Sequence, residues 1–141
     1  MFKTKCKMFY PTSKRAARWD AIKNALADWR QGRPEPRAYN NSLRAYIDVT
    51  QSVSTREILY WGSKLPESTA AICGHFNEIL RYAVRTGEAQ PRSNKGRRFE
   101  RLIILERHIE GLGTAKLTVG VRPDGRLVQY CITVPPAKAE A

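Results

Sequence analysis

The sequence has few cysteines and no long hydrophobic run. Its three cysteines, Cys6, Cys73 and Cys131, are odd in number and form no Cys-x-x-Cys pair, so a disulfide framework is not expected and a reducing compartment fits. No apolar stretch approaches the roughly 18 residues of a membrane-spanning helix. The basic N-terminus lacks the apolar segment of a signal peptide. We therefore expect a cytoplasmic protein with no membrane partner.

Recognisable motifs for metal or phosphate-loop chemistry are also lacking. The glycine-rich segment 111–116 lacks the Gly-Lys-Ser/Thr ending of a phosphate loop and lies between strands rather than before a helix. Cys73 and His75 supply only two metal ligands from one helix, with no second pair elsewhere. The sequence therefore predicts no metal and no other cofactor.

Catalytic candidates are few because the chain has only two histidines, His75 and His108. Metal-independent ribonucleases that cleave through the 2′-hydroxyl need a general base, a general acid and a cation near the phosphate. Glu106 and His108 share one face of a predicted strand, whereas Arg101 and Arg107 lie on the other. An exposed polar strand face explains the same pattern, so no catalytic residue is assigned and catalysis is left open.

Charge of one sign dominates the composition. Lys and Arg number 25 against 13 Asp and Glu, a formal net charge of +12. The excess is +7 over residues 1–50, +4 over 51–98 and only +1 over 99–141. Such an excess favours a polyanionic partner, either nucleic acid or an acidic protein or ribonucleoprotein surface. A basic protein that is merely soluble is the alternative.

The basic side chains that we expect to meet this partner come from the first two thirds of the chain. They lie on a predicted N-terminal strand, on the polar face of the first helix and in a polar loop. They are Lys3, Lys5, Lys7, Lys14, Arg15, Arg18, Lys23, Arg92, Lys95, Arg97 and Arg98.

Periodicity predicts an α+β fold, with two to three helices packed on an antiparallel sheet of about four strands. The expected helices cover residues 13–31, 54–61 and 67–86. The expected strands cover residues 1–10, 99–109, 117–121 and 127–134, the last three forming a C-terminal meander; 32–42 and 88–98 are expected loops. Residues 45–50 fit either a strand or a helix end. Residues 1–136 are expected to form a single basic domain, and 137–141 a disordered tail.

Two features of the pattern carry specific expectations. The stripe of Trp19, Ile22, Leu26 and Trp29 has helical spacing and is predicted to pack on the sheet made by the meander. Gly32 suits the left-handed position that ends a helix, and the segment 122–125 reads as a tight turn closed by glycine.

One family resemblance rests on element order. A helix over residues 68–84, a loose loop, and a meander over 99–134 that closes on Gly-Arg-Leu-Val-Gln-Tyr resemble small domains of phage and conjugative-element polyvalent proteins. Some of those domains look like the barnase, EndoU and RelE type of ribonuclease fold. The resemblance covers about residues 54–134. It implies a mobile-element origin and a helix-then-sheet fold, and it assigns no catalytic residue.

Four functions remain open at this point. The expected one is binding of nucleic acid or a nucleoprotein without identifiable sequence readout. The alternatives are a mobile-element inhibitor that blocks a host protein or ribonucleoprotein by stoichiometric binding, a metal-independent ribonuclease, and a structural phage protein.

Overall fold

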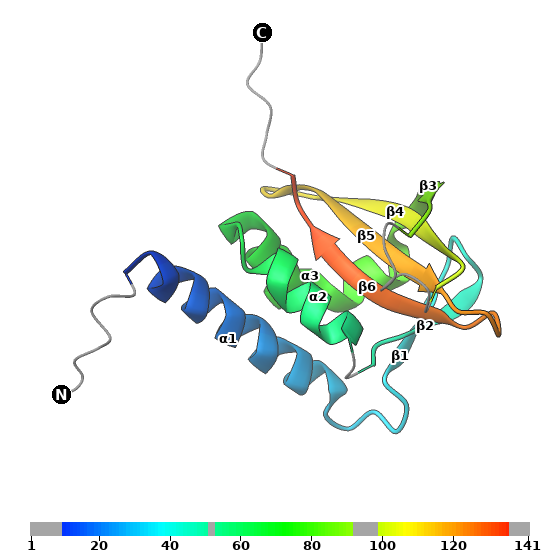
Figure 1. Ribbon diagram of the computed structural model, residues 1–141, viewed down its shortest axis with the longest axis horizontal. Coiled ribbons are helices and arrows are strands. Elements are labelled where there is room, and N and C mark those ends of the chain that lie inside the picture. The colour runs from blue at the N-terminus through cyan, green and yellow to red at the C-terminus, as the bar shows by residue number, and fades with distance from the viewer. Residues whose placement is uncertain (1–9, 51–52, 92–98, 136–141) are drawn as a thin grey trace, which may run out of the picture.

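The computed structural model describes residues 10–50, 53–91 and 99–135, in which the chain has an α+β fold with three helices and six strands (Figure 1). The helices are α1 (Tyr10–Arg30), α2 (Val53–Gly62) and α3 (Pro66–Tyr82). The strands are β1 (Arg37–Asn40), β2 (Ala45–Asp48), β3 (Val84–Ala89), β4 (Arg101–Ile109), β5 (Gly113–Val121) and β6 (Leu127–Thr133). None of the helices in these ranges combines the length and the apolarity that crossing a membrane requires.

The strands form one curled, mixed sheet in the order β1-β2-β6-β5-β4-β3. The predicted meander is confirmed, because β4 pairs antiparallel with β5 and β5 with β6. The predicted number of strands and the wholly antiparallel character are wrong. β3 adds an antiparallel strand at one edge, and the β1–β2 hairpin joins β6 by a parallel pairing of Ile47 with Leu127.

Helices α2 and α3 cover one face of the sheet, and α1 lies outside them (Figure 1). The apolar stripe of α1 therefore packs on α3 and α2, which corrects the prediction that it packs directly on the meander. Ile22 and Leu26 are buried in the core, while Trp19 and Trp29 are partly buried against it. The ring of Trp29 meets Phe76 of α3 edge-on, with 5.2 Å between centroids.

The third helix is shorter than its sequence pattern predicts. It ends at Tyr82 instead of near residue 86, and Val84 begins β3 by pairing with Glu106 of β4. Pairing with a long neighbouring strand overrides the local helical pattern here. The predicted loop over residues 32–42 likewise contains β1, whose Ala38 and Asn40 are buried. Residues 45–48, left undecided by periodicity, form β2.

Both predicted glycine positions adopt the left-handed backbone. Gly32 follows α1 with a φ of +79°, and Gly125 has a φ of +90°. The Gly125 N–H donates to the carbonyl oxygen of Arg122 at 2.8 Å, which closes the predicted turn between β5 and β6. Both conformations depend on residues close in sequence, so they could be predicted without knowledge of tertiary contacts.

Three expectations fall on parts of the chain that the structure leaves undescribed. The predicted N-terminal strand lies in residues 1–9, except that Tyr10 begins α1. Most of the predicted polar loop lies in residues 92–98. The predicted tail over residues 137–141 also lies outside the described residues.

Candidate nucleic-acid interface

The structure describes four of the eleven basic residues predicted to meet an anionic partner. Lys14, Arg15, Arg18 and Lys23 all lie on α1, and their side chains are described. The other seven lie outside the described residues: Lys3, Lys5, Lys7, Arg92, Lys95, Arg97 and Arg98. The site is therefore built from α1 outward.

Arg15 and Arg18 are engaged in holding α1 to the end of α2. Arg15 donates from Nη2 to the carbonyl oxygen of Tyr60 at 2.6 Å and from Nε to Ser63 Oγ at 2.9 Å. Arg18 donates from Nε to the carbonyl oxygen of Ser63 at 2.7 Å. The last carbonyl groups of a helix lack partners within the helix and carry partial negative charge. The two arginines supply that partner to α2, a structural role that the sequence did not reveal.

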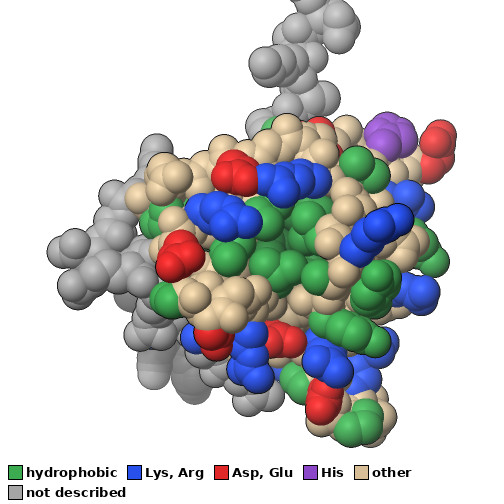
Figure 2. Space-filling model, turned by 90° about the vertical axis from the view of Figure 1, so that its right-hand side faces the viewer, with side chains coloured by type: hydrophobic (Ala, Val, Ile, Leu, Met, Phe, Trp, Pro, Cys, Tyr) green, Lys and Arg blue, Asp and Glu red, His purple; other side chains and the backbone are tan. Residues whose placement is uncertain are grey.

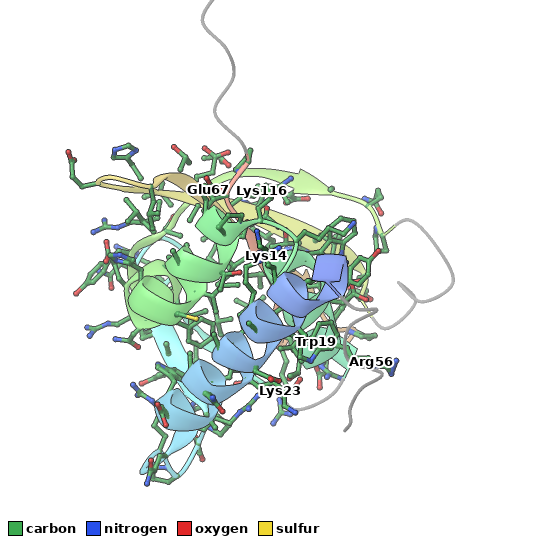
Figure 3. All side chains as sticks on the ribbon, turned by 90° about the vertical axis from the view of Figure 1, so that its left-hand side faces the viewer. Lys14, Trp19, Lys23, Arg56, Glu67 and Lys116 are labelled. Atoms are coloured by element: carbon green, nitrogen blue, oxygen red, sulfur yellow. The ribbon has the colours of Figure 1, made fainter. Side chains whose placement is uncertain are left out.

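Lys14 and Lys23 remain exposed on α1, as the helical pattern predicted. The structure adds three exposed cations that the sequence analysis did not select: Arg56 on α2, Lys64 just after it, and Lys116 on β5. Among the described residues, none of these five cations forms an ion pair. Figure 3 looks onto this end of the molecule, with Lys14 and Lys23 along α1 and Arg56 and Lys116 on neighbouring elements. We call these five side chains the basic end.

Aromatic side chains lie among the cations of the basic end. Tyr60 and Trp61 are 44% and 41% exposed and meet edge to face, with 5.1 Å between ring centroids. The Lys64 ammonium lies 4.7 Å from the Tyr60 centroid and 4.4 Å from that of Trp61. Trp19 is partly buried and lines a hollow of about 310 Å³ on α1 (Figure 3). Exposed aromatic rings beside cations are the usual components of a surface that binds nucleic acid strands.

The ion pairs of the described residues lie away from the basic end. All ion pairs between described side chains lie on α3, on the strands or on the segment leading into β1, for example Arg37 with Glu35 at 2.8 Å and Arg107 with Glu78 at 2.9 Å. Figure 2 shows the face at that end, where Lys and Arg alternate with Asp and Glu around a hydrophobic patch. Its cavity of about 530 Å³ includes Glu35 and Asp48 in its lining. Arg37, Arg85, Arg101 and Arg107 are paired with carboxylates there, whereas other arginines such as Arg81 and Arg126 form no ion pair among the described residues.

The histidines named as weak catalytic candidates lie on opposite faces of the sheet. His75 is on α3, where it interrupts the helix with φ −137° and ψ 21°. Its Nδ1 lies 2.9 Å from Glu78 Oε1, and Arg107 Nε donates to the other carboxylate oxygen at 2.9 Å. Glu106 and His108 are exposed on β4 and point away from α3 by strand alternation. The structure thus keeps Glu106 and His108 on one face of β4, as predicted, and separates His75 from both.

The sequence analysis did not predict the network around Glu78. The spacing of three residues between His75 and Glu78 could have indicated it, because side chains three apart are neighbours on a helix. The hydrogen bond from His75 and then that from Arg107 hold the pKa of the Glu78 carboxyl below its usual range. All three side chains are partly exposed, at 33% to 38%. The network joins α3 to β4 and brings one histidine, one carboxylate and one arginine together at the surface.

Cys73 and Cys131 are free thiols, and Cys73 is exposed at the surface. Burial raises the pKa of the Cys73 thiol and raises that of Cys131 to about 11. Within residues 10–50, 53–91 and 99–135, no three His, Cys, Asp or Glu side chains gather in an arrangement that could hold a metal ion.

The site is therefore a basic, partly aromatic surface rather than an enclosed catalytic pocket. Comparison of this chain with protein-family models, with curated proteins and with solved structures found no match.

Proposed function

We propose that this protein binds nucleic acid through the basic end, mainly by contacts to phosphates and without sequence readout. The observation that supports the proposal is the group of five exposed cations without ion pairs, which lies beside the exposed rings of Tyr60 and Trp61. None of the five cations of the basic end forms an ion pair among the described residues, whereas carboxylates on α3, on the strands and before β1 pair with nearby arginines. An unpaired set of cations around exposed aromatic rings suits a chain of phosphates that also presents bases.

The arrangement predicts a measurable number of phosphate contacts. Each phosphate that a Lys or Arg neutralises releases condensed counterions, so log affinity falls linearly with log salt. Contact by all five cations of the basic end predicts a slope of about −4. Engagement of basic residues outside the described ranges would make the slope steeper.

Charge reversal at matched positions tests the location of this surface. One variant carries Lys14→Glu, Lys23→Glu and Arg56→Glu; the control carries Arg81→Glu in the last turn of α3 with Arg122→Glu and Arg126→Glu in the turn between β5 and β6. Both change the net charge by the same amount. Fluorescence anisotropy with a labelled oligonucleotide across a salt series measures affinity and slope, and thermal melting confirms that both variants fold.

We expect the basic-end variant to lose at least tenfold in affinity and to show a slope shallower by about 2 to 3, with a smaller loss for the control. Equal losses in the two variants would show that diffuse net charge, not this surface, drives binding. If the unaltered protein binds neither DNA nor RNA at low salt, the proposal fails and an acidic protein surface becomes the better candidate partner.

A further inference from the structure

A groove of about 620 Å³ lies beside the cations of the basic end, where α2 passes into α3 and β6 ends. Its walls are largely apolar and its rim is cationic. The lining includes Trp61, Leu65, Val134 and Pro135, together with Lys64 and Lys116. No Asp or Glu is among the lining residues.

The residues that shape this groove are held in place by neighbouring elements. Pro66 opens α3 directly after the short connection that carries Lys64 and Leu65. The connection is fastened on one side by the bonds from Arg15 and Arg18 and on the other by Thr69, which donates to the carbonyl oxygen of Gly62 at 2.8 Å. At the far wall, Val134 donates its N–H to Ser68 Oγ at 2.9 Å. The groove is thus formed before any ligand arrives.

Trp61 is oriented by polar contacts although 41% of it is exposed. Its indole Nε1 donates to Glu57 Oε1 at 3.0 Å, and the Lys64 ammonium lies 4.4 Å from its ring centroid. The exposed part of this ring belongs to the lining of the groove, and tryptophan, with an apolar body and one polar atom, is enriched at binding surfaces. A fixed, exposed indole beside a free ammonium is therefore a recognition feature more than a core element.

We propose that the groove receives an unstacked base of a single-stranded nucleic acid, which stacks on Trp61 while Lys64 and Lys116 contact the flanking phosphates. This inference rests on the proposed binding of nucleic acid and names the class of strand. Apolar walls under a rim of cations complement a flat, apolar ring carried on an anionic backbone. The carboxylate opposite Lys116 in the strand register, Glu106, makes no ion pair with it, so the ammonium is available.

A duplex does not fit this groove, because its bases are paired and stacked and only their edges reach the grooves of the double helix. A single strand presents the faces of its bases, and stacking on an aromatic side chain tolerates any base. Preference for single strands without sequence readout is the expected behaviour.

Oligonucleotides that keep their phosphates but lack some bases distinguish base stacking from phosphate binding. The probes are a labelled strand of about 12 thymidines, the same strand with abasic sites in its central half, and a duplex of equal length. The full chain is compared with Trp61→Ala and Trp61→Phe, and with Tyr46→Ala as a control, because Tyr46 is also an exposed ring but lies at the other end. Anisotropy gives each affinity, and circular dichroism checks each fold.

The unaltered chain and Tyr46→Ala should bind the intact strand about tenfold or more tightly than the abasic one. Trp61→Ala should bind both strands equally and at the weaker affinity, and Trp61→Phe should restore most of the difference. If the unaltered chain binds intact and abasic strands equally, or binds the duplex more tightly, the groove does not receive a base. The proposal that the basic end binds phosphates would not be affected. Failure to bind any of the three probes would overturn the proposed function itself.

Discussion

Asn40 on β1 donates from its buried side-chain amide to the carbonyl oxygen of Leu80 in the last turn of α3, at 2.7 Å. The same nitrogen reaches the carbonyl oxygen of Ala83 at 3.1 Å, and the side-chain oxygen of Asn40 accepts from the Leu43 N–H at 2.7 Å. One amide therefore caps the end of a helix and shapes the β1–β2 hairpin.

Replacing Asn40 by alanine should destabilise the fold, because it leaves main-chain groups at the end of α3 buried without partners. We expect the free energy of unfolding to fall by about 2–4 kcal/mol, measured by urea denaturation. Asn41→Ala is the matched control, since the neighbouring side chain is exposed, and it should change stability by less than about 0.5 kcal/mol. Comparable losses in both variants would mean that the hairpin, not the buried amide, is being perturbed.

Gly120 on β5 should not tolerate alanine. A methyl group there would lie 2.5 to 2.6 Å from three atoms of the Phe99 ring, which covers this part of the sheet and meets Tyr130 edge-on. The ring must move, and we expect a loss of about 1–3 kcal/mol by thermal or chemical unfolding.

The control for that substitution is Gly74→Ala in α3, where a methyl group meets nothing within 4 Å. Alanine favours helix over glycine, so this variant should match or exceed the unaltered protein by up to about 1 kcal/mol. A Gly120→Ala protein with unchanged stability would show that Phe99 does not rest on the sheet.

Gln129 on β6 offers a route to higher stability. Its side chain is fully buried, and neither polar atom has a hydrogen-bond partner among the described residues. Burying an amide without partners is costly, so Gln129→Met, of similar shape, should raise the free energy of unfolding by about 1–3 kcal/mol. Gln129→Glu places an unpaired charge in the same position and should lower the melting temperature sharply. A less stable Gln129→Met protein would reveal that the amide is satisfied in solution.

The network of Glu78 with His75 and Arg107 should appear as pH-dependent stability. The pKa of Glu78 is lower in the folded chain than in the unfolded one, so folding favours the ionised carboxylate. Its contribution is complete above the unfolded value of about 4.3 and is lost as the pH falls through the folded pKa. Because the side chains are partly exposed, we expect about 1 kcal/mol or less.

Urea unfolding of the unaltered protein and of Glu78→Gln between pH 7 and pH 3 measures this difference. The two proteins should differ at pH 7 and converge in strong acid. Glu110→Gln, which removes an exposed carboxylate without an ion pair in the described chain, should show no such convergence. A gap between the unaltered protein and Glu78→Gln that does not narrow with acid would assign the effect to packing instead.

Local patterns in the sequence were sufficient to predict much of this protein. Period-two alternation and two glycine-containing turns predicted the C-terminal meander, and helical spacing predicted α1 and its buried Ile22 and Leu26. The excess of positive charge in the first two thirds of the chain follows directly from the number of basic and acidic residues. These features depend on residues within a few positions of one another, so the local sequence determines them without tertiary contacts.

The tertiary structure decided which basic residues are available and what lies beside them. Lys14 and Arg15 are adjacent on one helix, yet Lys14 is exposed while Arg15 bonds to Ser63, 48 positions away. The basic end collects Arg56, Lys64 and Lys116 only because α1 packs on α2 and α2 packs on β6, which pairs with β5. Pairing with β4 also turned residues 84–89 into an edge strand against their local preference. Such outcomes depend on contacts between distant segments, whose free energies outweigh local propensity and cannot be read from any single stretch of sequence.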